Sequence, residues 1–141
     1  LERSVSWFEP GGTFGRPRDS SKPPGPGIAD IHADSTGLLW VAISVADGEW
    51  ETALVEGGRD RYGRPRQALT VGDKNEYWDT RLEVVDPRTG TVVASVLLDP
   101  LVQGFTDTGE LITHLYRDGV VPTVEILEAR LANPNGGANG S

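Results

Sequence analysis

The sequence predicts an all-β fold built from antiparallel sheets, and three observations support this. The run at 38–46 (LLWVAISVA) is apolar at both its odd and its even positions, and it has no convincing helical periodicity. Asp, Gly and Pro residues bound short apolar segments along most of the chain. A short strand, a D-(S)-T-G type of turn and a longer strand occur twice, with turns at 34–37 and 106–109. These patterns are typical of β-hairpins.

Composition limits the function classes. A chain of 141 residues is long enough for one domain with a real core. Its net charge of -8 argues against binding to duplex nucleic acid or to an anionic membrane surface. No apolar run approaches the roughly 18 residues of a membrane span. The lack of cysteine excludes disulfides and thiolate metal sites. The compartment stays open, with a secreted or periplasmic location slightly favoured.

The N-terminal region separates into a strand and a connector. Residues 1–9 predict a lone strand, with Val5 and Trp7 on one face and Phe8 on the other. No partner follows nearby, so its neighbour must come from far along the chain or from another chain. Residues 10–27 hold five prolines and five glycines, which predicts a connector without regular structure. Because the chain begins at Leu1 and contains no Met, we expect a processed chain, a fragment or an expression product.

A first sheet is expected within 28–98, from strands at 28–34, 38–46, 80–86 and 91–98. A strand with one wet face should alternate apolar and polar residues, so the strand at 38–46 should be covered on both faces. Residues 47–79 interrupt the pattern and predict a long insertion, with a small hairpin as an option.

A second sheet is expected within 99–131, from strands at 102–106, 110–117 and 122–131. The tail at 132–141 (ANPNGGANGS) is of low complexity and is expected to be flexible. Repeated units of short strands suggest sheets that stack radially, because each unit buries its faces on its neighbours.

The segments GLLWVA and LEVVDPRTGTVVASVLL resemble blades of the six-bladed β-propeller superfamily, of the NHL-like and two-component-regulator types. The resemblance implies about two blades, one complete at 28–98 and one at 99–131 that lacks its outermost strand. The strand at 1–9 would close the incomplete blade. Two blades cannot form a ring, so either upstream blades or further copies of the chain are implied.

A candidate metal site lies on the first predicted strand. Asp30, His32 and Asp34 alternate along it and should share one face, where carboxylate and imidazole groups can hold a divalent ion such as calcium. The alternative, which we favour, is that the aspartates bond to turn backbone and the histidine packs between sheets. No cofactor is expected otherwise.

The insertion carries a second candidate, a ligand or partner loop. Its members are aromatic or basic: Trp50, Arg59, Arg61, Arg64, Arg66, Tyr77 and Trp78. Guanidinium groups suit carboxylate or phosphate ligands. The insertion also holds eight acidic residues against five basic ones, so local ion pairs are the simpler use of the arginines. The aromatic residues can equally anchor the loop to the sheet, and this alternative is at least as well supported as a binding role.

No spacing of titratable residues demands catalysis, so no catalytic residue is assigned. We expect a binding or assembly module that self-associates into a ring or polymer, with Val5, Trp7 and Phe8 on the assembly strand. One alternative is a fragment of a metal-dependent propeller hydrolase of the lactonase type. Another is an extracellular structural subunit joined by strand exchange.

Overall fold

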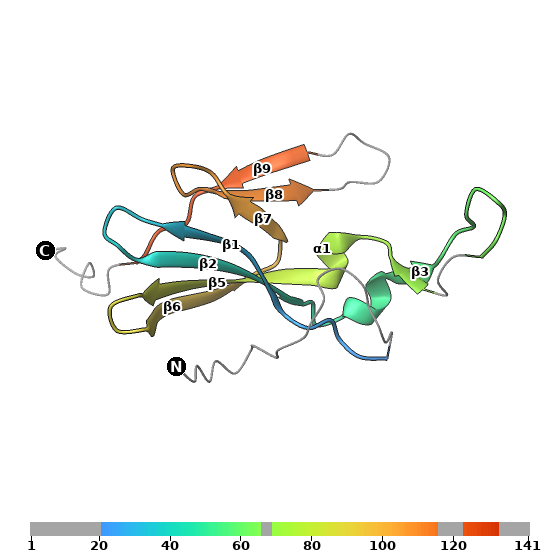
Figure 1. The fold of residues 1–141 in the computed structure, drawn as a ribbon, viewed down its shortest axis with the longest axis horizontal. Coiled ribbons are helices and arrows are strands. Elements are labelled where there is room, and N and C mark those ends of the chain that lie inside the picture. The colour runs from blue at the N-terminus through green and yellow to red at the C-terminus, as the bar shows by residue number, and fades with distance from the viewer. Residues whose placement is uncertain (1–20, 66–68, 116–122, 133–141) are drawn as a thin grey trace, which may run out of the picture.

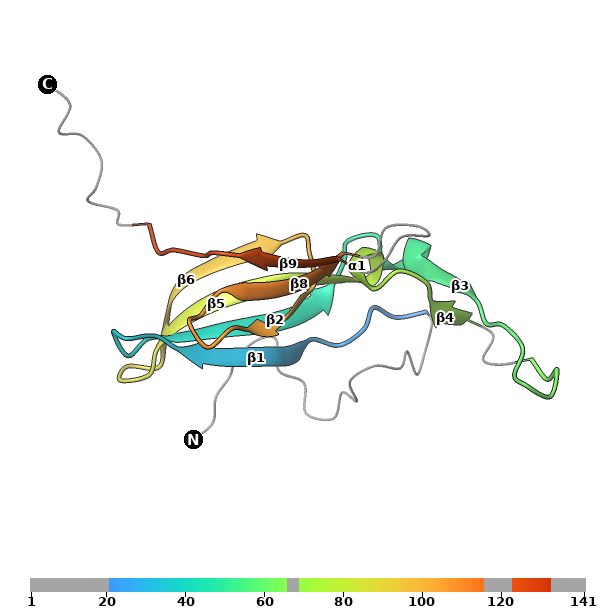
Figure 2. The same ribbon diagram turned by 90° about the horizontal axis from the view of Figure 1, so that it is seen from above.

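The computed structural model describes residues 21–65, 69–115 and 123–132. Two antiparallel sheets pack against each other, and a small hairpin projects from one end (Figures 1 and 2). The predicted all-β class is confirmed, because helix is limited in these residues to two segments of four residues each. None of the described helices has the length and apolar character needed to cross a membrane.

The first sheet has the order β1-β2-β5-β6, with every neighbouring pair antiparallel. Its strands are β1 (Gly27–Ala33), β2 (Leu39–Ala46), β5 (Trp78–Asp86) and β6 (Thr91–Leu98). The predicted strand ranges agree with these to within two residues at each end. The sheet therefore joins two hairpins that the 47–77 segment separates in sequence.

The second strand, β2, is buried on both faces in its middle. Four consecutive residues, Val41 to Ser44, are buried, and neighbouring positions of a strand point to opposite faces. This agrees with the prediction from its two apolar parities. The two edge strands of this sheet, β1 and β6, differ from β2 because they expose large apolar side chains.

The second sheet has the order β7-β8-β9. Its strands are β7 (Val102–Phe105), β8 (Leu111–Leu115) and β9 (Thr123–Leu127). The expected extension of the last strand to residue 131 is wrong: residues 128–131 are not strand. Here Ala129 packs against the core, and Arg130 Nε donates to Glu128 Oε1 at 2.9 Å. Residues 116, 117 and 122 of the expected strands lie outside the described residues.

The core lies between the two sheets. Ala42, Leu82, Val102 and Leu111 form its buried centre, and Trp40 is among the partly buried residues packed around it. On one side β7 lies against β1, so the first strands of the two sheets are neighbours (Figure 1). Inside the core, the Val102 N–H donates to the hydroxyl oxygen of buried Thr80 at 2.8 Å.

The 47–77 segment forms a small unit of its own at the end of the first sheet. It contains a 3₁₀ turn (Trp50–Ala53), the hairpin strands β3 (Leu54–Glu56) and β4 (Leu69–Val71), and α1 (Lys74–Tyr77). The expected small hairpin is therefore present. Asp73 caps α1, because its side chain accepts a hydrogen bond from the Asn75 N–H at 2.8 Å.

The two repeated turns share one geometry. In both 34–38 and 106–110, the N–H of the first residue donates to the carbonyl of the fifth, at 2.9 and 2.8 Å. The glycine N–H then donates to the carbonyl of the first residue, at 3.1 Å for Gly37 and 3.0 Å for Gly109. Both glycines have positive φ, 85° and 91°, which L side chains rarely adopt.

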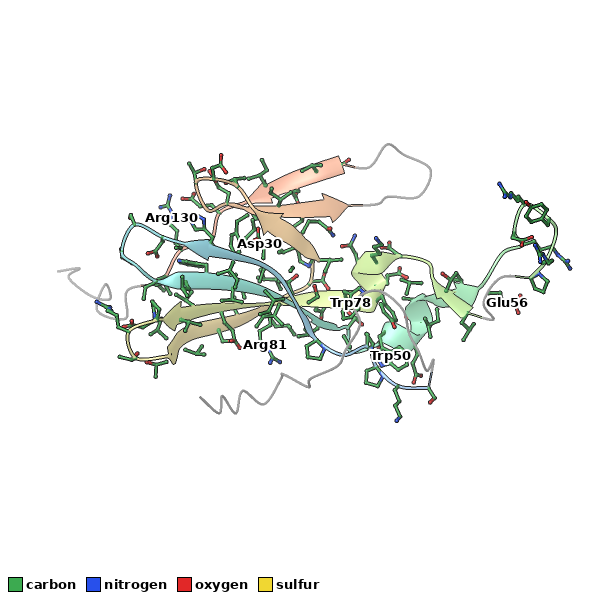
Figure 3. The ribbon with its side chains drawn as sticks, in the orientation of Figure 1. Asp30, Trp50, Glu56, Trp78, Arg81 and Arg130 are labelled. Carbon is green, nitrogen blue, oxygen red and sulfur yellow. The ribbon has the colours of Figure 1, made fainter. Side chains whose placement is uncertain are left out.

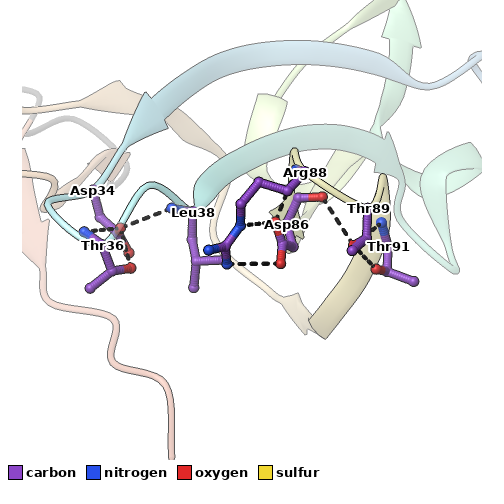
Figure 4. A network of polar contacts seen from close by, with 7 residues as sticks. All are labelled: Asp34, Thr36, Leu38, Asp86, Arg88, Thr89 and Thr91. Carbon is purple, nitrogen blue, oxygen red and sulfur yellow. Dashed lines mark hydrogen bonds and ion pairs between the residues drawn. The ribbon is translucent and has the colours of Figure 1, made fainter.

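The hairpin turn between β5 and β6 lies at the same end of the first sheet as the turn between β1 and β2 (Figure 4). Asp86 organises it, because its carboxylate accepts from the Arg88 backbone N–H and from two guanidinium nitrogens at 2.9–3.0 Å. The pair is exposed, so it fixes the turn more than it stabilises the fold.

Candidate functional site

Three carboxylates meet at one end of the first sheet. Asp47 directly follows β2, Asp79 is the second residue of β5, and Asp99 directly follows β6. Because these strands are neighbours and antiparallel, the ends of β2 and β6 lie beside the start of β5. One oxygen from each side chain lies within 4.8 Å of the other two. Among the described residues this is the one group of three or more such ligands.

Asp79 is the inner member of this cluster. It is only 8% exposed, whereas Asp47 is partly buried and Asp99 is exposed. Its Oδ1 atom is buried and has no hydrogen-bond partner. Burial first, and then the charge of Asp47, a hydrogen bond shared with Asp47 and the charge of Asp99, raise the pKa of Asp79 to about 6.

The flanking segments hold the cluster in place. The Asp47 N–H donates to the Tyr77 carbonyl at 3.1 Å, and one Asp47 oxygen, Oδ1, accepts from the Glu49 N–H at 2.6 Å. The connector after Asp99 is tied down as well, since the Leu101 N–H donates to Asn75 Oδ1 at 3.3 Å. No ion pair of the described residues involves any of the three aspartates. The cluster therefore gathers negative charge without a cationic side chain from this part of the chain.

The predicted metal residues Asp30, His32 and Asp34 are not brought together as a ligand set. Asp30 lies between β1 and β7 (Figure 3), where its Oδ2 accepts from the Phe105 N–H at 2.9 Å. The His32 ring packs beside the Phe105 ring, with 5.7 Å between centroids. The packing of His32 between the sheets corresponds to the alternative that we favoured from the sequence, whereas Asp30 bonds to the backbone of β1 and β7 and not to that of a turn.

Asp34 lies beyond the end of β1, in the turn. Its Oδ1 accepts from the backbone N–H of Thr36 at 2.8 Å and of Leu38 at 3.1 Å (Figure 4), and its Oδ2 accepts from Trp40 Nε1 at 2.9 Å. Hydrogen bonds from the Thr36 hydroxyl and the Trp40 indole, in that order, lower its pKa to about 2. The carboxylate therefore holds the turn and stays ionised.

The aromatic residues of the predicted ligand loop form a second, smaller core. Trp50 and Tyr77 are buried with Ala53, and their rings meet edge to face at 6.2 Å. Trp78 packs edge to face on Tyr77 at 5.2 Å. Figure 3 shows Trp50 and Trp78 near the base of the projecting hairpin, where they anchor it to the first sheet.

Arg59, Arg61 and Arg64 of that loop lie in the segment that follows β3. Arg59 donates to the Gly63 carbonyl at 2.7 Å, and Arg64 pairs with Asp60 at 3.4 Å. Arg61 and Arg64 both stack on the Tyr62 ring. These local contacts occupy the described arginines, and Arg66 lies outside the described residues.

The assembly strand with Val5, Trp7 and Phe8 also lies outside the described residues. The structure does describe the edge that such a strand could join. Here β9 is the last strand of the second sheet, and its Val124 and Ile126 are 53% and 60% exposed. These two residues and Ile112 share the face that points away from the first sheet, because Ile112 pairs with Ile126.

Comparison of the chain with protein-family models, with curated proteins and with solved structures gives no match.

Proposed function

We propose that this chain is a non-catalytic assembly module of the propeller type, which self-associates by adding a strand to its second sheet. The strongest support for this proposal is that the two sheets differ in their number of strands. The first has four strands and the second has three in the described residues, ending in β9. Val124 and Ile126 leave apolar surface exposed on that last strand. Exposed apolar edge strands are the usual places for pairing with another chain.

The stacking of the sheets supports the propeller form of the proposal. In a propeller the innermost strands of successive blades lie closest together, and here β1 contacts β7. The strand at 1–9 of a second copy is the proposed occupant of the β9 edge, because its Val5, Trp7 and Phe8 are apolar on both faces. A head-to-tail contact of this kind makes a ring if its rotation closes, and a polymer if it does not.

The hydrolase alternative has less support. It depended on Asp30, His32 and Asp34, and the two carboxylates serve the backbone of the chain itself. The alternative of an extracellular subunit joined by strand exchange uses the same contact. Of the two outcomes of that contact, this alternative commits to the open polymer and to an extracellular structural role.

Light scattering coupled to size-exclusion chromatography tests the proposal on the full chain. We expect a discrete mass above the 15.2 kDa of one chain, and three copies for a six-bladed ring. Deletion of residues 1–9 should release monomers. A broad distribution of large species would favour the open polymer, and a stable monomer at high micromolar concentration would overturn the proposal.

A point variant with a matched control makes the test specific to β9. Val124→Lys places a charge on the proposed contact and should lower the mass. Val55→Lys makes the same change at a similarly exposed valine of β3 and should leave the mass unaltered. Equal effects of the two changes would argue against an assembly contact at β9.

A further inference from the structure

We propose that Asp47, Asp79 and Asp99 form a binding site for a hard divalent cation, with Ca²⁺ as the best fit. This site is distinct from the one expected on β1 and lies at the opposite end of β2 from the Asp34 turn. The proposal goes beyond the assembly function and does not depend on it.

The spacing of the three carboxylates suits a shared ion. Ca²⁺ binds oxygen ligands at about 2.3–2.6 Å, so two ligands of one ion lie up to roughly 5 Å apart. The three ligand atoms here all lie within 4.8 Å of one another. They reach this spacing without backbone adjustment, because the pairing of β2, β5 and β6 already sets the three strand ends side by side.

A second observation, separate from the clustering, points to a missing ligand. Asp79 is more than nine-tenths buried, and its Oδ1 has no hydrogen-bond partner in the structure. Buried carboxylate oxygens are normally paired, because burying an unsatisfied charged group is costly. A cation between Asp79 and its two neighbours would give the buried Asp79 carboxylate a partner and would offset the repulsion among the three charges.

The chemistry of the ligands selects the class of ion. All three are carboxylates, with no imidazole or thiolate, which favours Ca²⁺ or Mg²⁺ over Zn²⁺. The set mixes a buried, a partly buried and an exposed side chain, so water can complete the coordination from the Asp99 side. Ca²⁺ tolerates such irregular geometry, whereas Mg²⁺ requires a nearly ideal octahedron.

A bound ion would link parts of the fold that are far apart in sequence. It would tie the start of the 47–77 unit, at Asp47, to the connector between the two sheets, at Asp99. The connector already bonds to Asn75 through Leu101, and the next residue, Val102 at the start of β7, bonds to Thr80. The site would therefore stabilise the junction at which the projecting hairpin, the first sheet and the second sheet meet.

Calcium titration of the metal-free full chain, followed by thermal unfolding and isothermal calorimetry, tests the proposal. We expect one ion per chain with a Kd of about 10⁻⁴–10⁻³ M, as in exposed sites with few ligands. At ten times the Kd the Tm should rise by a few degrees. Mg²⁺ should bind more weakly. No saturable binding and no shift of Tm at millimolar Ca²⁺ would overturn the proposal.

Variants assign the effect to these residues. Asp79→Asn should abolish the calcium-dependent shift of Tm, and Asp99→Asn, at an exposed position that tolerates change, should weaken binding by about 10-fold or more. Asp107→Asn removes the same charge from an exposed turn and should leave binding unchanged. Loss of binding in the Asp107 variant, or its retention in the Asp99 variant, would overturn the assignment. Because the readouts are ion binding and Tm, failure here is separable from failure of assembly.

Discussion

The carboxylate of Asp30 accepts a hydrogen bond from the backbone N–H of Phe105 at 2.9 Å, across 75 residues of sequence. This contact joins β1 of the first sheet to β7 of the second. It depends on Gly104, since a Cβ at that position would lie 2.9 Å from Asp30 Oδ2. A polar side chain and a glycine thus set the separation of the two sheets at one side, while apolar side chains fill the remaining interface.

Replacing Asp30 should therefore weaken the packing of the sheets. Asp30→Ala leaves the Phe105 N–H without its acceptor and also removes the acceptor of the Ile31 N–H. We expect a loss of about 1–3 kcal/mol in the free energy of unfolding, measured by urea denaturation. Asp30→Asn keeps one acceptor oxygen, so its free energy of unfolding should fall by less. If Asp30→Ala lowers the free energy of unfolding no more than Asp107→Ala does, the contact contributes nothing to stability.

The buried hydroxyl of Thr80 makes the second link between the sheets. Thr80→Val keeps the shape of the side chain but leaves the Val102 N–H without a partner inside the core. The free energy of unfolding should fall by about 1–3 kcal/mol. Thr80→Ser retains the hydroxyl and loses a methyl group, so it should cost about 1 kcal/mol. Thermal or urea unfolding compares the two, and a larger loss for the serine variant would contradict this role.

The strands were predictable because the evidence for them is local. Alternation and Asp- or Gly-containing turns mark the hairpin of β1 and β2, and the two apolar parities of β2 indicate its burial. The repeat of the turns at Gly37 and Gly109 was also visible in the sequence. The propeller assignment, by contrast, remains a prediction, since a two-sheet stack is compatible with it without requiring it.

The aspartate cluster was missed because its members are 32 and 20 residues apart in sequence. A signal did exist, since an aspartate lies at the same end of three strands predicted to be neighbours. It becomes visible only when the strand order is combined with the direction of each strand. The roles of Trp50 and Tyr77 could not be derived in the same way, because an aromatic residue in an insertion can face either solvent or a core that the insertion itself builds.

The two turn glycines provide a matched pair of substitutions. Gly37 and Gly109 have nearly the same φ, but only Gly109 faces a neighbour: a Cβ there would lie 2.7 Å from His32 Nε2. Gly37→Ala should cost about 1 kcal/mol of stability from the backbone alone. Gly109→Ala should lower the stability by more than Gly37→Ala does. This additional loss should become smaller when Gly109→Ala is combined with His32→Ala. Equal costs for the two glycines in urea denaturation would show that the His32 ring moves away freely.

The pH dependence of stability should report on Asp79. Its pKa in the folded chain is about 6, above the ordinary value of 3.8, so the folded state binds this proton more tightly than the unfolded state. The stabilisation is therefore complete below about pH 4 and is lost as the pH rises through about 6.

For a shift of this size, the loss is roughly 2 kcal/mol of unfolding free energy between pH 4 and pH 8, measured with a chelator present. Asp79→Asn carries no titrating proton, so its stability relative to the unmodified chain should rise by that amount over the same range. Urea denaturation at a series of pH values measures this difference. A constant difference between the two proteins would mean that Asp79 titrates normally, and that water or another group satisfies its buried oxygen.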